Sequence, residues 1–225
     1  MKKNLPLLVS LAGGVLLGFA ATVMFRAGFA SGGQSFVSLY NGQKSPVMAY
    51  VAFGADSAVL PTAWPFCTPT AKLNCQFPMP GQSLQVLPLE GNYLNATISF
   101  GAPVGCGSTK AELNVNNPNW YDTLDVSLVD GYSNNVLIEV VDNGQPGIVL
   151  GPPRGKTGNE KVLGVFPYGC DCCVERKNPP CGIPTGRDGC KSGSQYDPDV
   201  PCQWQGSVKG GASVAKVVLV GGTPL

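Results

Sequence analysis

The sequence predicts an all-β protein: an antiparallel β-sandwich with a disulfide-rich loop subdomain. Short segments in which apolar and polar residues alternate recur over residues 35–150, and turn dipeptides separate them. Outside the amino terminus, no long segment has the periodicity of a helix. Six of the nine cysteines then gather in residues 170–202, which lack apolar periodicity. A chain of 225 residues has room for one sizeable core with a subdomain.

The strand segments are separated by recognisable turns. Asn41-Gly42 predicts one hairpin and Glu90-Gly91 a second. Residues 54–83 hold five prolines, which remove ladder donors, and are predicted to form an irregular loop. The predicted strands, in chain order, are residues 35–40, 47–53, 84–89, 95–100, 124–129, 135–141 and 214–220.

The proline-rich loop contains its own candidates for burial and cross-linking. Cys67 and Cys75 lie close enough in sequence to form a disulfide that pins it. Trp64 and Phe66 are expected in the core, with an exposed ligand platform as the alternative, because aromatic side chains supply large buried areas.

The amino terminus has the composition of an export signal. Lys2-Lys3 precede an uncharged run over residues 5–25, and small residues follow it. Because this run is also long enough to span a bilayer, residues 1–30 are either a signal peptide or an N-terminal membrane anchor. In both cases we expect the rest of the chain to be secreted and extracellular, or held at the cell surface by residues 5–25.

Cysteine usage agrees with an oxidising compartment. The odd count of nine leaves one cysteine unpaired if all the others pair. Cys-Asp-Cys-Cys has no second closely spaced pair beside it, so disulfides are favoured over a thiolate metal site. The cysteines expected in disulfides, with one left over, are Cys67, Cys75, Cys106, Cys170, Cys172, Cys173, Cys181, Cys190 and Cys202.

Composition excludes several classes of function. The formal net charge is +1 and only 13% of residues are charged, so no basic surface exists for nucleic acid. The chain has no histidine, which excludes Ser-His-Asp and Cys-His catalysis and His-ligated zinc. Gly155-Lys156-Thr157 is not a complete phosphate loop, since residue 150 is leucine where glycine is required. We expect neither a cofactor nor a metal.

The segment that ends in Asp130-Gly131 carries two carboxylates. Leu124, Val126 and Leu128 alternate with Asp125, as on a strand with one buried face. Asp125 and Asp130 are an odd number of positions apart, which places them on opposite faces of a flat strand. Only the turn at Asp130 could bring the two carboxylates together.

This segment resembles the thaumatin-like (osmotin-type, pathogenesis-related group 5) family. The family carries Tyr-Asp-Val-Ser-Leu-Val-Asp-Gly-Phe, which Asp125-Val-Ser-Leu-Val-Asp130-Gly131-Tyr132 matches closely, and Lys110-Ala-Glu-Leu113 is similar to its Ala-Glu-Phe. The resemblance covers residues 109–141, and more loosely residues 35–50 and the cysteine-rich tail. It implies a sandwich built from residues 31–150 and 205–225, with a loop subdomain at 151–204. The family has more cysteines than this chain, so its disulfide connectivity does not transfer.

The resemblance also implies an acidic cleft between sandwich and subdomain. The family's cleft combines an arginine, a glutamate and three aspartates, of which Glu112, Asp125 and Asp130 match three. The arginine and the third aspartate have no counterpart. Tyr132, Trp120 and Tyr121 would offer aromatic faces to a sugar. The alternative is structural: Asp130 would serve its turn, Asp125 a solvated face or an internal hydrogen bond, and Glu112 a solvent-facing strand position.

Three functions follow from these residues. The first is an exported, defence-type protein that binds cell-wall polysaccharide, such as β-glucan, through Glu112, Asp125, Asp130 and Tyr132. The second is a weak endo-β-1,3-glucanase, with Glu112 and Asp125 as the candidate catalytic pair. The third is a non-catalytic structural surface protein anchored by its amino terminus. The expected partner is a polysaccharide or cell-wall glycan, with no nucleic acid, and a membrane only through an uncleaved N-terminal segment.

Overall fold

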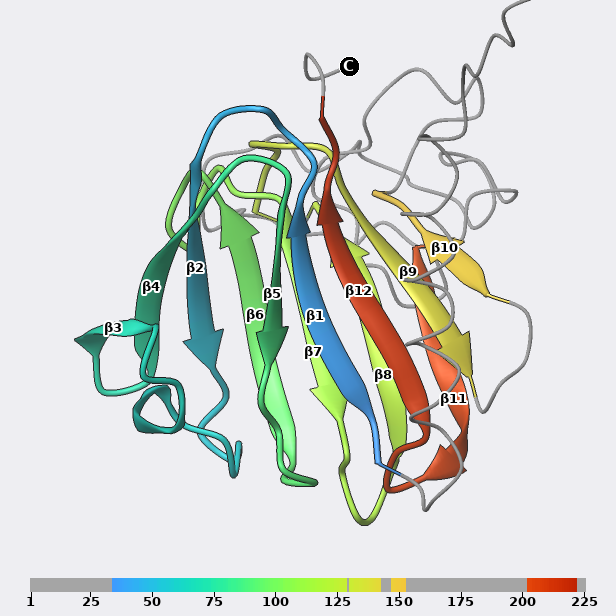
Figure 1. Cartoon of the computed structure of the whole chain (residues 1–225). Helices are drawn as coiled ribbons and strands as arrows, with labels where there is room; N and C mark the ends of the chain where they lie inside the picture. Colours follow the sequence, from blue (N-terminus) through green and yellow to red (C-terminus); the bar gives the residue numbers. More distant parts are fainter. Residues whose placement is uncertain (1–33, 129, 143–146, 153–201, 222–225) are drawn as a thin grey trace, which may run out of the picture. The chain divides into compact units, whose positions relative to one another are not determined.

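The computed structural model describes residues 34–128, 130–142, 147–152 and 202–221. Within these residues the chain forms strands and one short 3-10 helix, η1, so the all-β prediction is confirmed (Figure 1). The elements are β1 Phe36–Asn41, β2 Val47–Phe53, η1 Pro61–Ala63, β3 Thr68–Ala71, β4 Asn74–Met79, β5 Ser83–Leu87, β6 Leu94–Phe100, β7 Lys110–Val115, β8 Tyr121–Ser127, β9 Val136–Asp142, β10 Ile148–Leu150, β11 Gln203–Lys209 and β12 Ser213–Leu219.

The strands form two sheets packed as a sandwich. The five-stranded sheet has the order β10-β9-β12-β1-β5, and the seven-stranded sheet has the order β11-β8-β7-β6-β2-β4-β3. All neighbours are antiparallel except β1 and β12, which pair in parallel. One apolar cluster draws on both sheets, for example Leu39 and Val217 from the first and Ile98 and Leu124 from the second. This cluster is the core between the two inner faces.

The hairpin predicted at Asn41-Gly42 is wrong, because β1 and β2 lie in different sheets. Asn41 is fully buried, and its Nδ2 donates hydrogen bonds to the carbonyls of Ser45, Met79 and Pro80 at 3.0, 3.3 and 3.0 Å. Neither Asn41 nor Gly42 has the positive φ that a type I′ hairpin turn requires. The asparagine instead builds a corner at which the chain passes from one sheet to the other.

The turn predicted at Glu90-Gly91 forms, but it does not close a hairpin. Glu90 and Gly91 have φ values of 50° and 76°, and the amide of Asn92 donates to the carbonyl of Leu89 at 2.8 Å. However, β5 pairs with β1, whereas β6 pairs with β2 and β7. The turn therefore also joins the two sheets. The residues of the turn determine that the chain reverses here. The packing of the flanking strands determines which sheet each strand joins.

Residues 54–83 hold more regular structure than predicted, because they contain η1 and the β3–β4 hairpin. Pro78 is accommodated in β4 because β3 pairs with β4 only opposite residues 74–76, which leaves β4 an edge at the proline. The predicted disulfide between Cys67 and Cys75 is confirmed, with the Cα atoms 5.5 Å apart.

The prediction that Trp64 and Phe66 belong to the core is also confirmed. Trp64 is buried, and its Nε1 donates to the carbonyl of Pro88 at 2.9 Å. Phe66 is partly buried against the core and stacks on Trp64, with 5.9 Å between ring centroids. The cross-linked hairpin is therefore packed onto the sandwich through its aromatic side chains.

Asp122 on β8 ties the two sheets together. Its buried carboxylate accepts hydrogen bonds from the hydroxyls of Ser35, which precedes β1, and of Ser213 on β12. It also accepts the amide of Asn116, after β7, at 2.8 Å. Ser213 lies on β12 and Ser35 directly before β1 of the five-stranded sheet, whereas Asp122 lies on β8 and Asn116 directly after β7 of the seven-stranded sheet. This network therefore fixes one sheet against the other.

The two outer faces differ in chemistry. The outer face of the five-stranded sheet exposes apolar side chains such as Leu84 and Val149 around the ion pair of Lys216 with Glu139. The outer face of the seven-stranded sheet is polar, and one row runs across it in register through Thr97, Glu112, Asp125 and Gln203. The polar face is therefore the part of the sandwich that offers hydrogen-bonding chemistry.

Several sequence-based predictions lie outside the described residues. They are the signal or anchor at residues 1–30, most of the loop subdomain at 151–204, and the cysteines Cys170, Cys172, Cys173, Cys181 and Cys190. Cys106 and Cys202 are disulfide-bonded. In the part of the chain that the structure describes, no helix has the length and hydropathy needed to cross a membrane.

Candidate functional site

Glu112 and Asp125 face each other on the polar face of the seven-stranded sheet. Strand periodicity places them there: Leu113 and Leu124, their neighbours in sequence, are buried in the core, so the alternate side chains point outward. β7 and β8 pair antiparallel with Glu112 directly opposite Asp125. Directly opposed residues have Cβ atoms about 5 Å apart, so two carboxyl groups in this register interact strongly.

Burial and this neighbour change the acidity of Asp125. Desolvation raises the pKa of Asp125, and the charge and hydrogen bonding of Glu112 raise it further, to about 9, although the Lys110 ammonium opposes the shift. At neutral pH Asp125 is therefore protonated. The Asp125 proton then lies in the hydrogen bond between the two carboxyl groups.

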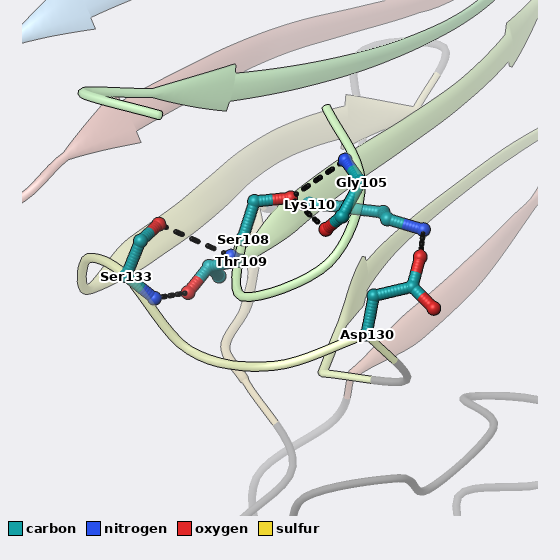
Figure 2. A network of polar contacts seen from close by, with 6 residues as sticks. All are labelled: Gly105, Ser108, Thr109, Lys110, Asp130 and Ser133. Carbon is teal, nitrogen blue, oxygen red and sulfur yellow. Dashed lines mark hydrogen bonds and ion pairs between the residues drawn. The ribbon is translucent and has the colours of Figure 1, made fainter. Parts of the chain in front are cut away.

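Lys110 links the third predicted acid to this pair. Lys110 and Glu112 lie two residues apart on β7, so their side chains share the outer face. The Lys110 ammonium forms an ion pair with the carboxylate of Asp130, and both side chains are mostly buried, at 14% and 15% exposed (Figure 2). We call Lys110, Glu112, Asp125 and Asp130 the carboxylate cluster.

The loops that hold Lys110 and Asp130 together are tied by reciprocal hydrogen bonds (Figure 2). The amide of Thr109 donates to Oγ of Ser133 at 3.2 Å, and the amide of Ser133 donates to Oγ1 of Thr109 at 3.1 Å. The Ser108 hydroxyl donates to the carbonyl of Gly105 at 2.7 Å and accepts its amide at 3.1 Å. These bonds fix the Asp130 turn against the start of β7.

One oxygen of the pair and one oxygen next to it lack hydrogen-bond partners among the described residues. These buried atoms are Asp125 Oδ1 and Asn114 Oδ1. Asn114 lies two residues after Glu112 on β7, so the two unpaired oxygens belong to neighbouring rows of the same face. Buried polar atoms nearly always have a partner, so these two oxygens, like Ser38 Oγ and Asn135 Oδ1 elsewhere, are polar atoms that the described part of the chain leaves unsatisfied.

The structure brings Glu112 and Asp125 together directly and brings Asp130 to them through Lys110. Tyr132 is partly buried and directly follows the Asp130-Gly131 turn. Asn114 was missed by the sequence reasoning, and its spacing of two from Glu112 was the signal that could have found it.

Among the residues that the structure describes, no three histidine, cysteine, aspartate or glutamate side chains are grouped so that they could hold a metal ion. Asp130 is paired with Lys110, whereas Glu112 and Asp125 face each other. Their arrangement suits hydrogen bonding to hydroxyl groups.

Comparisons with known proteins add little to this picture. The sequence matches no protein-family model and no curated protein. Among solved structures, the chain is similar to the thaumatin-like xylanase inhibitor TLXI, at 13% sequence identity and a TM-score of 0.42, over 81% of this chain and 97% of that chain. A TM-score this low does not establish a shared fold. The resemblance to thaumatin-like proteins therefore depends on the residues of β7, β8 and the Asp130 turn.

Proposed function

We propose that this protein is an exported, defence-type carbohydrate-binding protein that recognises cell-wall polysaccharide of the β-glucan kind. Glu112, Asp125 and Asp130 supply the polar contacts, and Tyr132 supplies an aromatic contact. The observation that carries the proposal is the in-register Glu112–Asp125 pair on the polar face, where Asp125 Oδ1 and Asn114 Oδ1 lack hydrogen-bond partners among the described residues.

The protonation state of the pair suits sugar hydroxyls. The Asp125 proton lies in the hydrogen bond with Glu112, so the remaining carboxyl oxygens of the pair accept hydrogen bonds from sugar hydroxyls. A sugar hydroxyl both donates and accepts, so neighbouring hydroxyls of one ring can satisfy the two carboxyl groups and Asn114 Oδ1 together. The in-register row from Thr97 to Gln203 offers further polar side chains to a chain-like ligand.

The same pair argues against hydrolysis. A retaining glycosidase separates its two carboxyl groups by about 5–5.5 Å, and an inverting enzyme by more, so that the scissile bond fits between them. Glu112 and Asp125 lie close enough for hydrogen bonding between them to contribute to the raised pKa of Asp125. Because two groups that share a proton leave no space for a glycosidic bond, we propose binding without turnover.

Isothermal titration calorimetry with β-1,3-gluco-oligosaccharides tests this proposal. Asp125→Asn keeps a donor and an acceptor in the same shape, so its affinity should stay within about threefold of the parent protein. Asp125→Ala and Glu112→Gln should each weaken binding by about tenfold or more, which corresponds to roughly 1.4 kcal/mol. Glu139→Gln, on the outer face of the five-stranded sheet, is the matched control and should bind as the parent does.

The same preparations distinguish the alternatives. Release of reducing ends by the parent protein, lost in Glu112→Gln while binding persists, would replace the proposal with the endo-β-1,3-glucanase. Failure of the parent protein to bind any glucan, mannan or chitin would leave the anchored structural surface protein.

A further inference from the structure

An aromatic pair with a lysine lies at the end of β8 that is farther from Asp130. Trp120 immediately precedes β8 and is 49% exposed, and its ring meets that of Tyr121 edge to face, with 5.8 Å between centroids. The ammonium of Lys209, at the end of β11, stands 6.0 Å from the Trp120 ring centroid and 5.6 Å from that of Tyr121. We call Trp120, Tyr121 and Lys209 the aromatic–lysine group.

Backbone contacts fix this group in place. The amide of Trp120 donates to the carbonyl of Asn117 at 3.1 Å, and its carbonyl accepts the amide of Gly210 at 3.0 Å. Tyr121 pairs directly with Lys209 in the β8–β11 ladder. An exposed tryptophan on a loop tied at both sides is preorganised, so a ligand that stacks on it loses little affinity to ordering the protein.

Lys209 is available to an anion. In the described part of the chain the ion pairs are Lys110–Asp130 and Lys216–Glu139, and Lys209 has no carboxylate partner there. Its ammonium is exposed beside two rings, whose faces attract a cation. Lys209 can therefore pair with a negatively charged group on a ligand.

The group and the carboxylate cluster lie along one strand face. Tyr121 and Asp125 are four residues apart on β8, so their side chains point to the same side, about 13 Å apart along the strand. Thr123 lies between them on the same face and is partly exposed. A short oligosaccharide is long enough to reach from one group to the other, whereas a single sugar ring is not.

We propose that Trp120, Tyr121 and Lys209 form a second subsite, which binds a sugar ring carrying an anionic substituent. The aromatic rings cover the apolar face of the sugar, and Lys209 pairs with its negative charge. This inference rests on the proposed function, because it assumes that the protein binds a polysaccharide. It adds that the polysaccharide contains anionic sugars. The carboxylate cluster then takes uncharged hydroxyl-rich residues of the same chain, and the aromatic–lysine group takes the charged one.

Calorimetry with three preparations of one β-1,3-glucan tests the subsite: the neutral, the carboxymethylated and the sulfated polymer. The parent protein should bind a charged polymer about tenfold more tightly than the neutral one in dilute salt. The carboxymethylated and sulfated polymers show which anion is preferred.

Four variants test the residues. Lys209→Gln should abolish the preference for charged over neutral polymer, and Lys209→Arg should keep it. Trp120→Ala should weaken binding of all three polymers. Lys216→Gln, on the other sheet, removes the same charge and should keep the preference.

The outcomes separate this inference from the proposed function. Binding of the neutral polymer with no preference for charge, or a preference that survives Lys209→Gln, overturns the subsite and leaves the proposed function standing. Lys209-dependent binding of the charged polymers without any binding of the neutral one supports the subsite and overturns neutral glucan recognition. Absence of binding to all three overturns both.

Discussion

The Asp130 turn leaves no room for a side chain on Gly131, because Gly107 occupies that place. A Cβ added to Gly131 would stand 2.7 Å from the Cα of Gly107, closer than real Cβ contacts come. Gly131 also has a φ of 139°, which residues with a side chain rarely adopt. The turn that carries Asp130 therefore packs directly on the backbone of Gly107, whose amide donates to the carbonyl of Asp130 at 2.7 Å.

Gly131→Ala tests this relationship. The added methyl group should lower the free energy of unfolding by roughly 2 kcal/mol or more, because the backbone must shift or adopt a strained φ. Urea unfolding at neutral pH measures the change. Gly105→Ala is the matched control: Gly105 also has a positive φ, of 146°, but an added Cβ meets nothing within 4 Å. Equal losses in the two variants would show that the contact with Gly107 does not matter.

The raised pKa of Asp125 predicts a pH-dependent stability. Between the ordinary value of 3.8 and about 9, the folded state holds a proton on Asp125 that the unfolded chain releases. The contribution of this group therefore falls as pH rises through that window, by up to about 1.4 kcal/mol per pH unit. Asp125→Asn removes the linkage, so its free energy of unfolding should vary less between roughly pH 5 and pH 8.

Asp56→Asn is the control for this experiment. Hydrogen bonds from Asn95 and Tyr93 lower the pKa of Asp56, so its linkage acts only below its ordinary value of 3.8. Asp56→Asn should leave the slope above about pH 5 unchanged. A slope that is the same in the parent protein and in Asp125→Asn would contradict a shared proton between Glu112 and Asp125.

The disulfide between Cys67 and Cys75 should stabilise the sandwich mainly by restricting the unfolded chain. For a sequence separation of 8, loop-closure entropy gives a contribution of about 2.5 kcal/mol. Replacing both buried cysteines with alanine should lower the free energy of unfolding by about this amount, measured by guanidinium unfolding without reductant. Unchanged stability in the double variant would show that the β3–β4 hairpin is held by the packing of Trp64 and Phe66 alone.

Removing the carboxylate that ties the two sheets together should be costly. Asp122→Ala leaves the hydroxyls of Ser35 and Ser213 and the amide of Asn116 without their acceptor in the interior. Since hydrogen bonds to a charged group contribute about 1.5–3 kcal/mol each, the loss should be at least about 3 kcal/mol. Asp142→Ala, which removes an exposed bond from the amide of Ser207, should cost about 1 kcal/mol or less. Similar thermal unfolding of the two variants would contradict the role assigned to Asp122.

The sequence by itself determined the local properties of this protein. Alternation along β8 predicted that Leu124, Val126 and Leu128 would be buried and that Asp125 would point away from them, and all three apolar residues are fully buried. Local spacing likewise predicted the Cys67–Cys75 bond. Both features are local. The burial pattern follows from the alternation of apolar and polar residues along one strand, and the disulfide joins two cysteines that are close in sequence.

Only the tertiary structure decided which segments meet. Asn41-Gly42 and Glu90-Gly91 are compatible with a hairpin within one sheet and with a connection between two sheets. Which of the two forms depends on the sheet that each flanking strand joins. The register that sets Glu112 opposite Asp125, and the turn that brings Asp130 to Lys110, depend on pairing between strands. An alternating pattern specifies which face of a strand is buried but not its partner, because every strand with the same pattern offers the same apolar face to the core.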